Sequence, residues 1–141
     1  TADNIKETTM SAASNYLEIE VLDHVLGKGN RNFTSPASLR VALFTAMPTD
    51  AGGGTEVAVG NGYGRQEATF AAASGGSATT SGDLTFGPAS GADFGTILGI
   101  GIFDATTGGN LLIFTTLAAQ KTVSDGDTFV ISAGNLTVSL A

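Results

Sequence analysis

The chain has 141 residues, 42% of them hydrophobic, which is enough for one domain with a buried core and too apolar for a disordered chain. The net charge is −7 with only 6 Lys and Arg, which argues against nucleic acid as a partner. There is no cysteine and no apolar run near the roughly 20 residues of a membrane helix, so disulfides, thiolate chemistry and a membrane partner are excluded.

The first 13 residues are small and polar, and we expect them to form an extended arm rather than a core element. Ile5 and Met10 are the large apolar residues of this arm, too few for it to fold alone. We therefore expect a neighbouring protein to order the arm, with Ile5 and Met10 as partner contacts. No basic region followed by an apolar block begins the chain, so no secretory signal is predicted.

One helix is predicted at residues 15–26. Asn15 and Glu18 form a capping-box pattern, with Ser14 as an alternative cap, and Gly27 ends the helix. Apolar residues recur at helical spacing at Leu17, Ile19, Val21, Leu22, Val25 and Leu26. We expect either the end of the β-sandwich or a neighbouring subunit to cover this stripe.

The rest of the sequence predicts short strands separated by glycine-rich turns. Residues 39–45 form a strand that is apolar on both faces and therefore central. The long loop 46–66 precedes short strands at 67–72, 78–80 and 84–86.

Two apolar runs around the turn 104–110 predict a hairpin within 99–117. Strands follow at 128–132 and 136–140, where Leu136, Val138 and Leu140 alternate with polar residues and should share a buried face. The fold class is therefore mainly β. We predict one antiparallel β-sandwich domain at 14–141, with an N-terminal helix and an extended N-terminal arm at 1–13.

No pattern indicates catalysis. His24, the only histidine, follows Asp23 on the predicted helix, where neighbours in sequence do not face each other, so a helix-surface histidine is favoured. Asp125 and Asp127 could serve a glycosidase or a calcium site, but Asp-Gly-Asp before a strand is typical of a turn. We predict no catalytic, cofactor or metal site and no enzyme.

Tyr63 and Arg65 lie in the long loop and are of types enriched at protein interfaces, so we predict them as partner contacts. The alternative, a loop folded onto its own sandwich, is equally open.

Four segments resemble a known family. They are Ser14-Asn-Tyr-Leu-Glu-Ile-Glu-Val-Leu-Asp-His-Val-Leu, Leu39-Arg-Val-Ala-Leu-Phe-Thr-Ala-Met-Pro-Thr-Asp, Gly62-Tyr-Gly-Arg-Gln and Gly101-Ile-Phe-Asp-Ala-Thr-Thr-Gly-Gly-Asn-Leu-Leu. The family comprises small virion proteins of tailed bacteriophages, often labelled tail fibre proteins, and the resemblance extends from Ser14 to Leu140. It implies a structural protein made in the bacterial host cytoplasm, with no family active site. A comparable all-β build with an arm is typical of capsid cement proteins, which sit as trimers on the head lattice.

We therefore expect a capsid decoration (cement) protein on the outer surface of the virion head. Its partners would be the major capsid protein and copies of itself, as a homotrimer. The alternative is a tail or tail-fibre-associated structural protein. A carbohydrate-binding module is less favoured, because no Trp and only 2 Tyr leave little to stack on a sugar.

Overall fold

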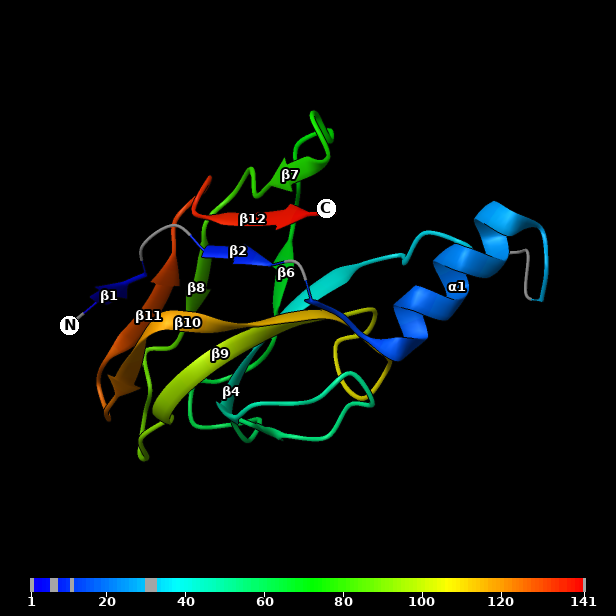
Figure 1. Cartoon of the computed structure of the whole chain (residues 1–141). Coiled ribbons are helices and arrows are strands. Elements are labelled where there is room, and N and C mark those ends of the chain that lie inside the picture. Colours follow the sequence, from blue (N-terminus) through cyan, green and yellow to red (C-terminus); the bar gives the residue numbers. More distant parts are fainter. Residues whose placement is uncertain (1, 6–7, 11, 30–32, 141) are drawn as a thin grey trace.

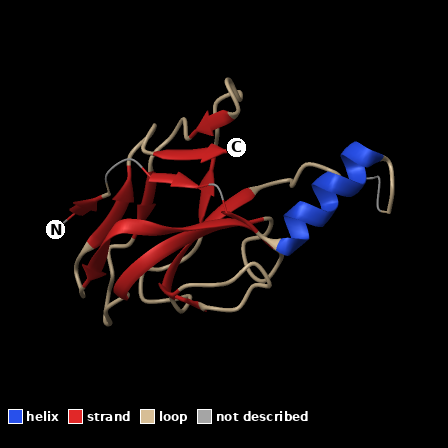
Figure 2. Cartoon of the chain, viewed as in Figure 1, coloured by secondary structure: helices blue, strands red, loops and turns tan. Residues whose placement is uncertain are grey.

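The computed structural model describes residues 2–5, 8–10, 12–29 and 33–140, and the chain is mainly β with one helix, as predicted (Figures 1 and 2). The helix is α1 (Asn15–Leu26). The strands are β1 (Ala2–Asn4), β2 (Thr8–Met10), β3 (Ala12–Ala13), β4 (Leu39–Ala46), β5 (Thr55–Glu56), β6 (Gln66–Ala68), β7 (Ser77–Thr79), β8 (Leu84–Phe86), β9 (Gly95–Phe103), β10 (Leu111–Val123), β11 (Thr128–Ile131) and β12 (Leu136–Ser139).

The largest sheet has six strands in the order β3-β10-β9-β4-β5, with β6 also paired to β4. The predicted hairpin is confirmed, because β9 and β10 pair antiparallel on either side of the 104–110 turn. The predicted central strand is confirmed as well: β4 lies between β9 on one side and β5 and β6 on the other. Gly101 of β9 allows close packing here, since a Cβ at this position would lie 2.9 Å from both Phe44 and Leu111.

Two three-stranded sheets complete the β-structure, in the orders β1-β11-β8 and β2-β12-β7. In both, a strand of the N-terminal arm pairs parallel with a C-terminal strand: β1 with β11 and β2 with β12. Ile5 and Met10 are buried in the core of their own chain, at 4% and 0% exposure. The arm is extended as predicted, but the expectation that it lies outside the core and needs a neighbour to order it is wrong.

The core takes side chains from all three sheets. They include Met10, Val41, Leu43, Leu84, Phe86, Ile97, Ile100, Phe129, Ile131 and Leu136. Phe86 and Phe129 meet edge to face with ring centroids 6.0 Å apart. At the end of β12 the predicted buried face is only partly formed: Leu136 is buried, Val138 is half-buried, and Leu140 is 72% exposed.

Helix α1 has the predicted bounds. Ser14, the alternative cap, is the N-cap and accepts a hydrogen bond from the Leu17 N–H, and Gly27 ends the helix at φ 69°. All twelve residues of α1 are described and none is buried, because the helix extends away from the strands (Figure 1). Beyond Leu17, the sandwich therefore does not cover the apolar stripe, and its contact with a neighbouring subunit stays a prediction. Among the described residues, no helix is long and apolar enough to span a membrane.

Candidate assembly surface

The first turn of α1 is anchored to the β-structure by backbone hydrogen bonds. The Ser14 N–H donates to the Leu112 carbonyl at 2.8 Å, and the Asn15 N–H donates to the Asp50 carbonyl at 2.9 Å. The buried Ser14 hydroxyl also donates to the Leu111 carbonyl. Because both β10 and the 46–66 loop hold this turn, the direction of the helix is fixed where it leaves the sheet.

The two sides of α1 have different surroundings. Leu17 packs against the edge of the core. The opposite side carries the helix stripe, which we define as Ile19, Leu22, Val25 and Leu26. These four side chains are 58%, 56%, 71% and 68% exposed, so nothing in the described part of the chain covers them.

An apolar groove of about 250 Å³ lies beside the base of α1. It is lined by Leu17, Leu39, Phe70, Ala78, Ile102, Leu112, Ile113 and Val138. None of these side chains is polar or charged, and Leu17, Leu39, Phe70, Ile113 and Val138 are only partly buried. The molecule therefore presents two uncovered apolar surfaces, the helix stripe and the apolar groove, at the same end.

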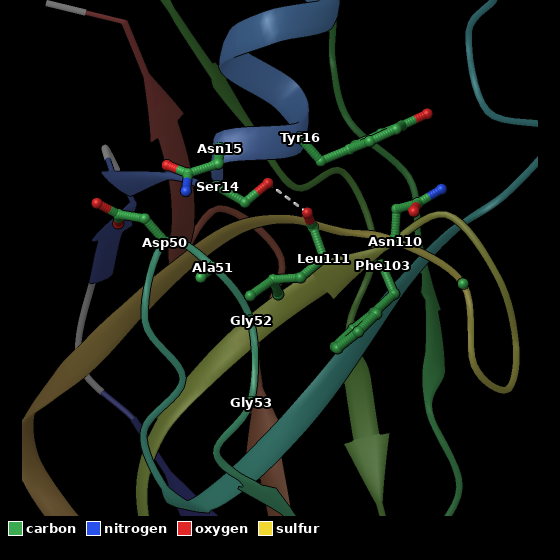
Figure 3. Close-up of a pocket in the computed structure, with 11 residues that line it drawn as sticks. Ser14, Asn15, Tyr16, Asp50, Ala51, Gly52, Gly53, Phe103, Asn110 and Leu111 are labelled. Atoms are coloured by element: carbon green, nitrogen blue, oxygen red, sulfur yellow. Dashed lines mark hydrogen bonds between the residues drawn. The ribbon is translucent and has the colours of Figure 1, made fainter.

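A second, polar hollow of about 490 Å³ lies at the N-terminal end of α1 (Figure 3). The side chains of Asn15 and Asp50 lie on one side of it, and those of Tyr16 and Asn110 lie on the other. Desolvation, together with nearby acidic side chains, raises the pKa of Tyr16, so its phenol stays protonated at neutral pH. In the described ranges, no group of three or more His, Asp or Glu side chains could hold a metal ion.

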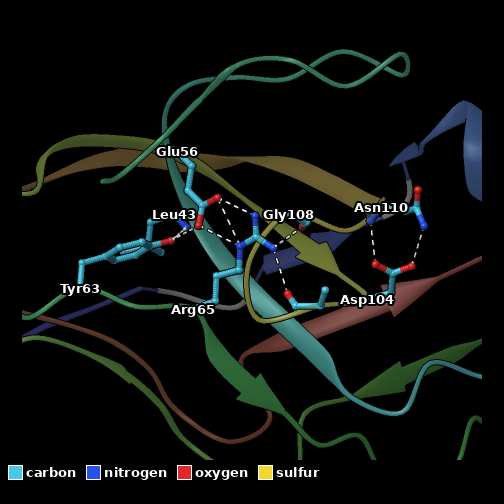
Figure 4. Close-up of polar contacts among 8 residues, drawn as sticks. Leu43, Glu56, Tyr63, Arg65, Asp104, Gly108 and Asn110 are labelled. Carbon is cyan, nitrogen blue, oxygen red and sulfur yellow. Dashed lines mark hydrogen bonds and ion pairs between the residues drawn. The ribbon is translucent and has the colours of Figure 1, made fainter. Parts of the chain in front are cut away.

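The Tyr63 side chain makes hydrogen bonds within its own chain (Figure 4). Its hydroxyl donates to Glu56 Oε2 at 2.8 Å and accepts from the Leu43 N–H at 3.1 Å. The side chain is only 4% exposed, and burial raises the pKa of Tyr63 far above its ordinary value. The phenol is therefore a neutral structural group that joins the long loop to β4.

Arg65 extends the same network (Figure 4). Nε and Nη2 bind the Glu56 carboxylate at 2.9 and 2.7 Å, and Nη1 donates to the carbonyls of Ala105 and Gly108. The guanidinium stacks on Phe103, 3.7 Å from the ring centroid. The structure thus shows the alternative in which the long loop folds onto its own sandwich. Contact of Tyr63 or Arg65 with a partner stays a prediction, as does contact of Ile5 or Met10.

Three residues were considered for catalysis or metal binding. As preferred from the sequence, His24 lies on the helix surface, and Asp125 and Asp127 lie in a turn. His24 is exposed on the surface of α1. Asp125 Oδ1 accepts from the Gly91 N–H at 2.8 Å, and Asp127 Oδ2 accepts from the Ser124 N–H at 3.2 Å. This backbone donor lowers the pKa of Asp127, as is usual for a carboxylate within a turn.

Sequence reasoning found the helix stripe but missed the apolar groove. The stripe follows helical spacing within one segment, which is visible in the sequence. The groove joins residues from α1, β4, β7, β9, β10 and β12, with Phe70 from the loop after β6. No short stretch of sequence carries a signal for such a surface.

Comparison with known families gives one match. The family described as Podophage GP4 fiber I protein gp80 matches residues 12–139. A search of curated proteins gives no match. The matched range begins at β3 and ends in β12, so it contains α1, the apolar groove and the Arg65 network.

Proposed function

This chain belongs to the Podophage GP4 fiber I protein gp80 family, and from that premise we propose that it is a non-enzymatic structural subunit of a phage tail fibre. The family membership confirms the resemblance to small virion proteins of tailed phages. The word fibre in the family's description supports the tail alternative over the head.

The observation that carries an assembly role is the uncovered helix stripe. An apolar helix face that the chain leaves in solvent, beside a second uncovered apolar surface, is typical of a protein–protein contact. Leu22, Val25 and Leu26 lie on a helix whose base is fixed to the sheet, so the stripe is held out in a defined direction. A virion subunit that must bind other subunits needs such a surface.

Capsid decoration is the role that the sequence favours, in part because a polar arm would suit a protein that lies across neighbouring subunits. The described arm residues instead pair with β10, β11 and β12 of their own chain. We therefore place the fibre role first and keep decoration of the head as the second candidate.

Labelling intact phage with antibodies raised against this chain tests the proposal. We expect electron microscopy to show label on the fibres at the tail, with none on virions treated with an unrelated antibody. Label over the head lattice would support capsid decoration instead. A glycan array probed with the purified chain tests the carbohydrate-binding alternative, and we expect no binding.

A further inference from the structure

The helix stripe and the apolar groove are complementary surfaces that one chain cannot bring together. The Ser14 and Asn15 backbone bonds fix the first turn of α1 beside the groove, and from there the helix runs away from the strands (Figure 1). Only Leu17, in the first turn, reaches the groove of its own chain. Ile19, Leu22, Val25 and Leu26 lie farther along the helix and stay in solvent.

We propose that the helix stripe of one copy packs against the apolar groove of a second copy, and that this contact joins copies of the chain head to tail. This inference goes beyond the proposed function and does not depend on where the protein sits in the virion. The contact buries the stripe of one copy against Leu39, Phe70, Ile113 and Val138 of the next. Leu17 of the receiving copy would then pack beside the incoming helix.

The chemistry of the two surfaces matches. A 12-residue helix is about 18 Å long, enough to lie across several strands. Ile19, Leu22 and Leu26 are spaced three and four residues apart, so they share one side of the helix. The groove lining is wholly apolar and offers these side chains the environment that their own chain does not.

Charge favours the groove over direct packing of two identical helices. Helix α1 carries Glu18, Glu20 and Asp23, and symmetric pairing of two copies would bring these acids toward one another. Like charges on packed helices are unfavourable. The groove contributes no charged side chain, so a helix that lies in it meets no such repulsion from the lining.

The stripe supplies only part of the area that a stable contact needs. A Val, Leu or Ile side chain offers roughly 60–120 Å² of apolar area. Because the stripe is 56–71% exposed, its four side chains can bury on the order of 150–300 Å². That is below the ~800 Å² per partner of a stable interface. The rest of the contact would come from the helix side chains that flank the stripe and from the rim of the groove.

The first test changes one residue of the stripe. Leu22→Glu places a charge on an exposed helix position, and Val59→Glu makes the same kind of change at another exposed site, 68% accessible and outside both surfaces. We expect light scattering at tens of micromolar to show an oligomer for the wild type and for Val59→Glu. Leu22→Glu should be a monomer with an unchanged circular dichroism spectrum. A monomeric wild type would overturn the proposal.

The second test separates helix-in-groove packing from helix-on-helix packing. Ala78→Glu alters the groove and leaves the helix intact, whereas Leu22→Glu alters the helix and leaves the groove intact. Each variant alone should be monomeric, and an equimolar mixture should form a heterodimer through the one intact contact. A folded Ala78→Glu variant that still forms the wild-type oligomer would show that the groove is not the binding surface.

The absence of cysteine from the chain permits a direct cross-linking test that does not require either surface to be disrupted. Copies carrying Leu22→Cys and differently tagged copies carrying Ala78→Cys should form a disulfide-linked heterodimer on mild oxidation. Val59→Cys in place of Leu22→Cys is the matched control and should give no such band. If Leu22→Cys cross-links mainly to itself, the helices pack on one another and the proposal is wrong.

Discussion

At the scale of single residues, the Glu56–Tyr63–Arg65 network holds the segment between β4 and β6. The Glu56 carboxylate binds both partners, and Arg65 continues to the carbonyls of Ala105 and Gly108 in the loop between β9 and β10. The Tyr63 hydroxyl satisfies the buried Leu43 N–H, which would be costly to leave without a partner, and the Arg65 side chain is only 6% exposed. Removing one side chain of this network should therefore destabilise the fold without changing the helix stripe or the apolar groove.

Tyr63→Phe removes the hydroxyl that accepts from the buried Leu43 N–H and donates to Glu56. We expect a loss of about 1–3 kcal/mol in the free energy of unfolding, because the Leu43 donor loses its partner. Urea unfolding followed by circular dichroism measures this loss. Tyr16→Phe is the control at the other tyrosine, which is 37% exposed, and should change stability by less than ~0.5 kcal/mol. Equal effects of the two substitutions would contradict the network.

Arg65→Lys keeps the charge but loses the two-point contact with Glu56, the fork to two carbonyls and the stacking on Phe103. We expect a loss of roughly 1–3 kcal/mol, since an ammonium cannot reproduce this geometry.

The matched control is Arg40→Lys. The Arg40 guanidinium makes a single ion pair of 3.4 Å with the exposed Glu67. Because Glu67 is 55% exposed, solvent weakens this pair, so the control should lose at most about 1 kcal/mol in the same urea titration. If the Arg65→Lys variant is as stable as the Arg40→Lys variant, the geometry of the Arg65 guanidinium does not contribute to stability.

At the scale of secondary-structure elements, the arm packs within its own chain and the helix leaves an apolar side uncovered, whereas the sequence predicted that the arm would bind a neighbour. The arm, expected to bind a neighbour, supplies strands to all three sheets of its own chain. The helix, which could have covered one end of the sandwich, leaves its apolar side in solvent. The element that binds a neighbour in our proposal is therefore α1, and the arm is part of the folding unit.

Met10→Ala tests the structural role of the arm. Met10 of β2 is fully buried, so the truncation should create a cavity and cost about 2–5 kcal/mol. Thr9→Ala, at the exposed position of the same strand, should have little effect. Thermal unfolding of both variants measures the difference. Deleting residues 1–13 should prevent stable folding, and a truncated chain with the wild-type melting temperature would contradict this role.

At the scale of the whole molecule, the proposed assembly joins chains that carry the same net charge of −7. The contact itself is apolar, while the rest of each surface repels its neighbours. Salt screens this repulsion and does not weaken apolar contacts.

We therefore expect tighter association in 1 M NaCl than in 50 mM NaCl, so that in sedimentation velocity the oligomer persists to a lower protein concentration at 1 M. Association that weakens as salt rises would indicate ion pairs at the interface instead. Because the Val59→Glu control adds one more negative charge outside the interface, its salt dependence should be slightly steeper than that of the wild type.

The candidate surface was predictable only in part. The sequence contains the stripe residues Ile19, Leu22, Val25 and Leu26, and their periodicity indicates a helix with one apolar side. Whether that side is buried depends on where the first turn is anchored. The Asn15 bond to Asp50 and the Ser14 bonds to β10 decide this, and they join residues 35 or more positions apart, which leave no local pattern.

The sequence by itself determined the bounds of α1, the β9–β10 hairpin, the central strand β4 and the family. Each of these depends on local signals, namely caps, turn glycines, side-chain periodicity and short motifs. Only the tertiary structure decided that β1 pairs with β11, that Met10 lies in the core and that Arg65 lies on Phe103. These contacts bring together residues far apart in the chain, and their stability comes from burial and hydrogen bonds that exist only once the sheets have assembled.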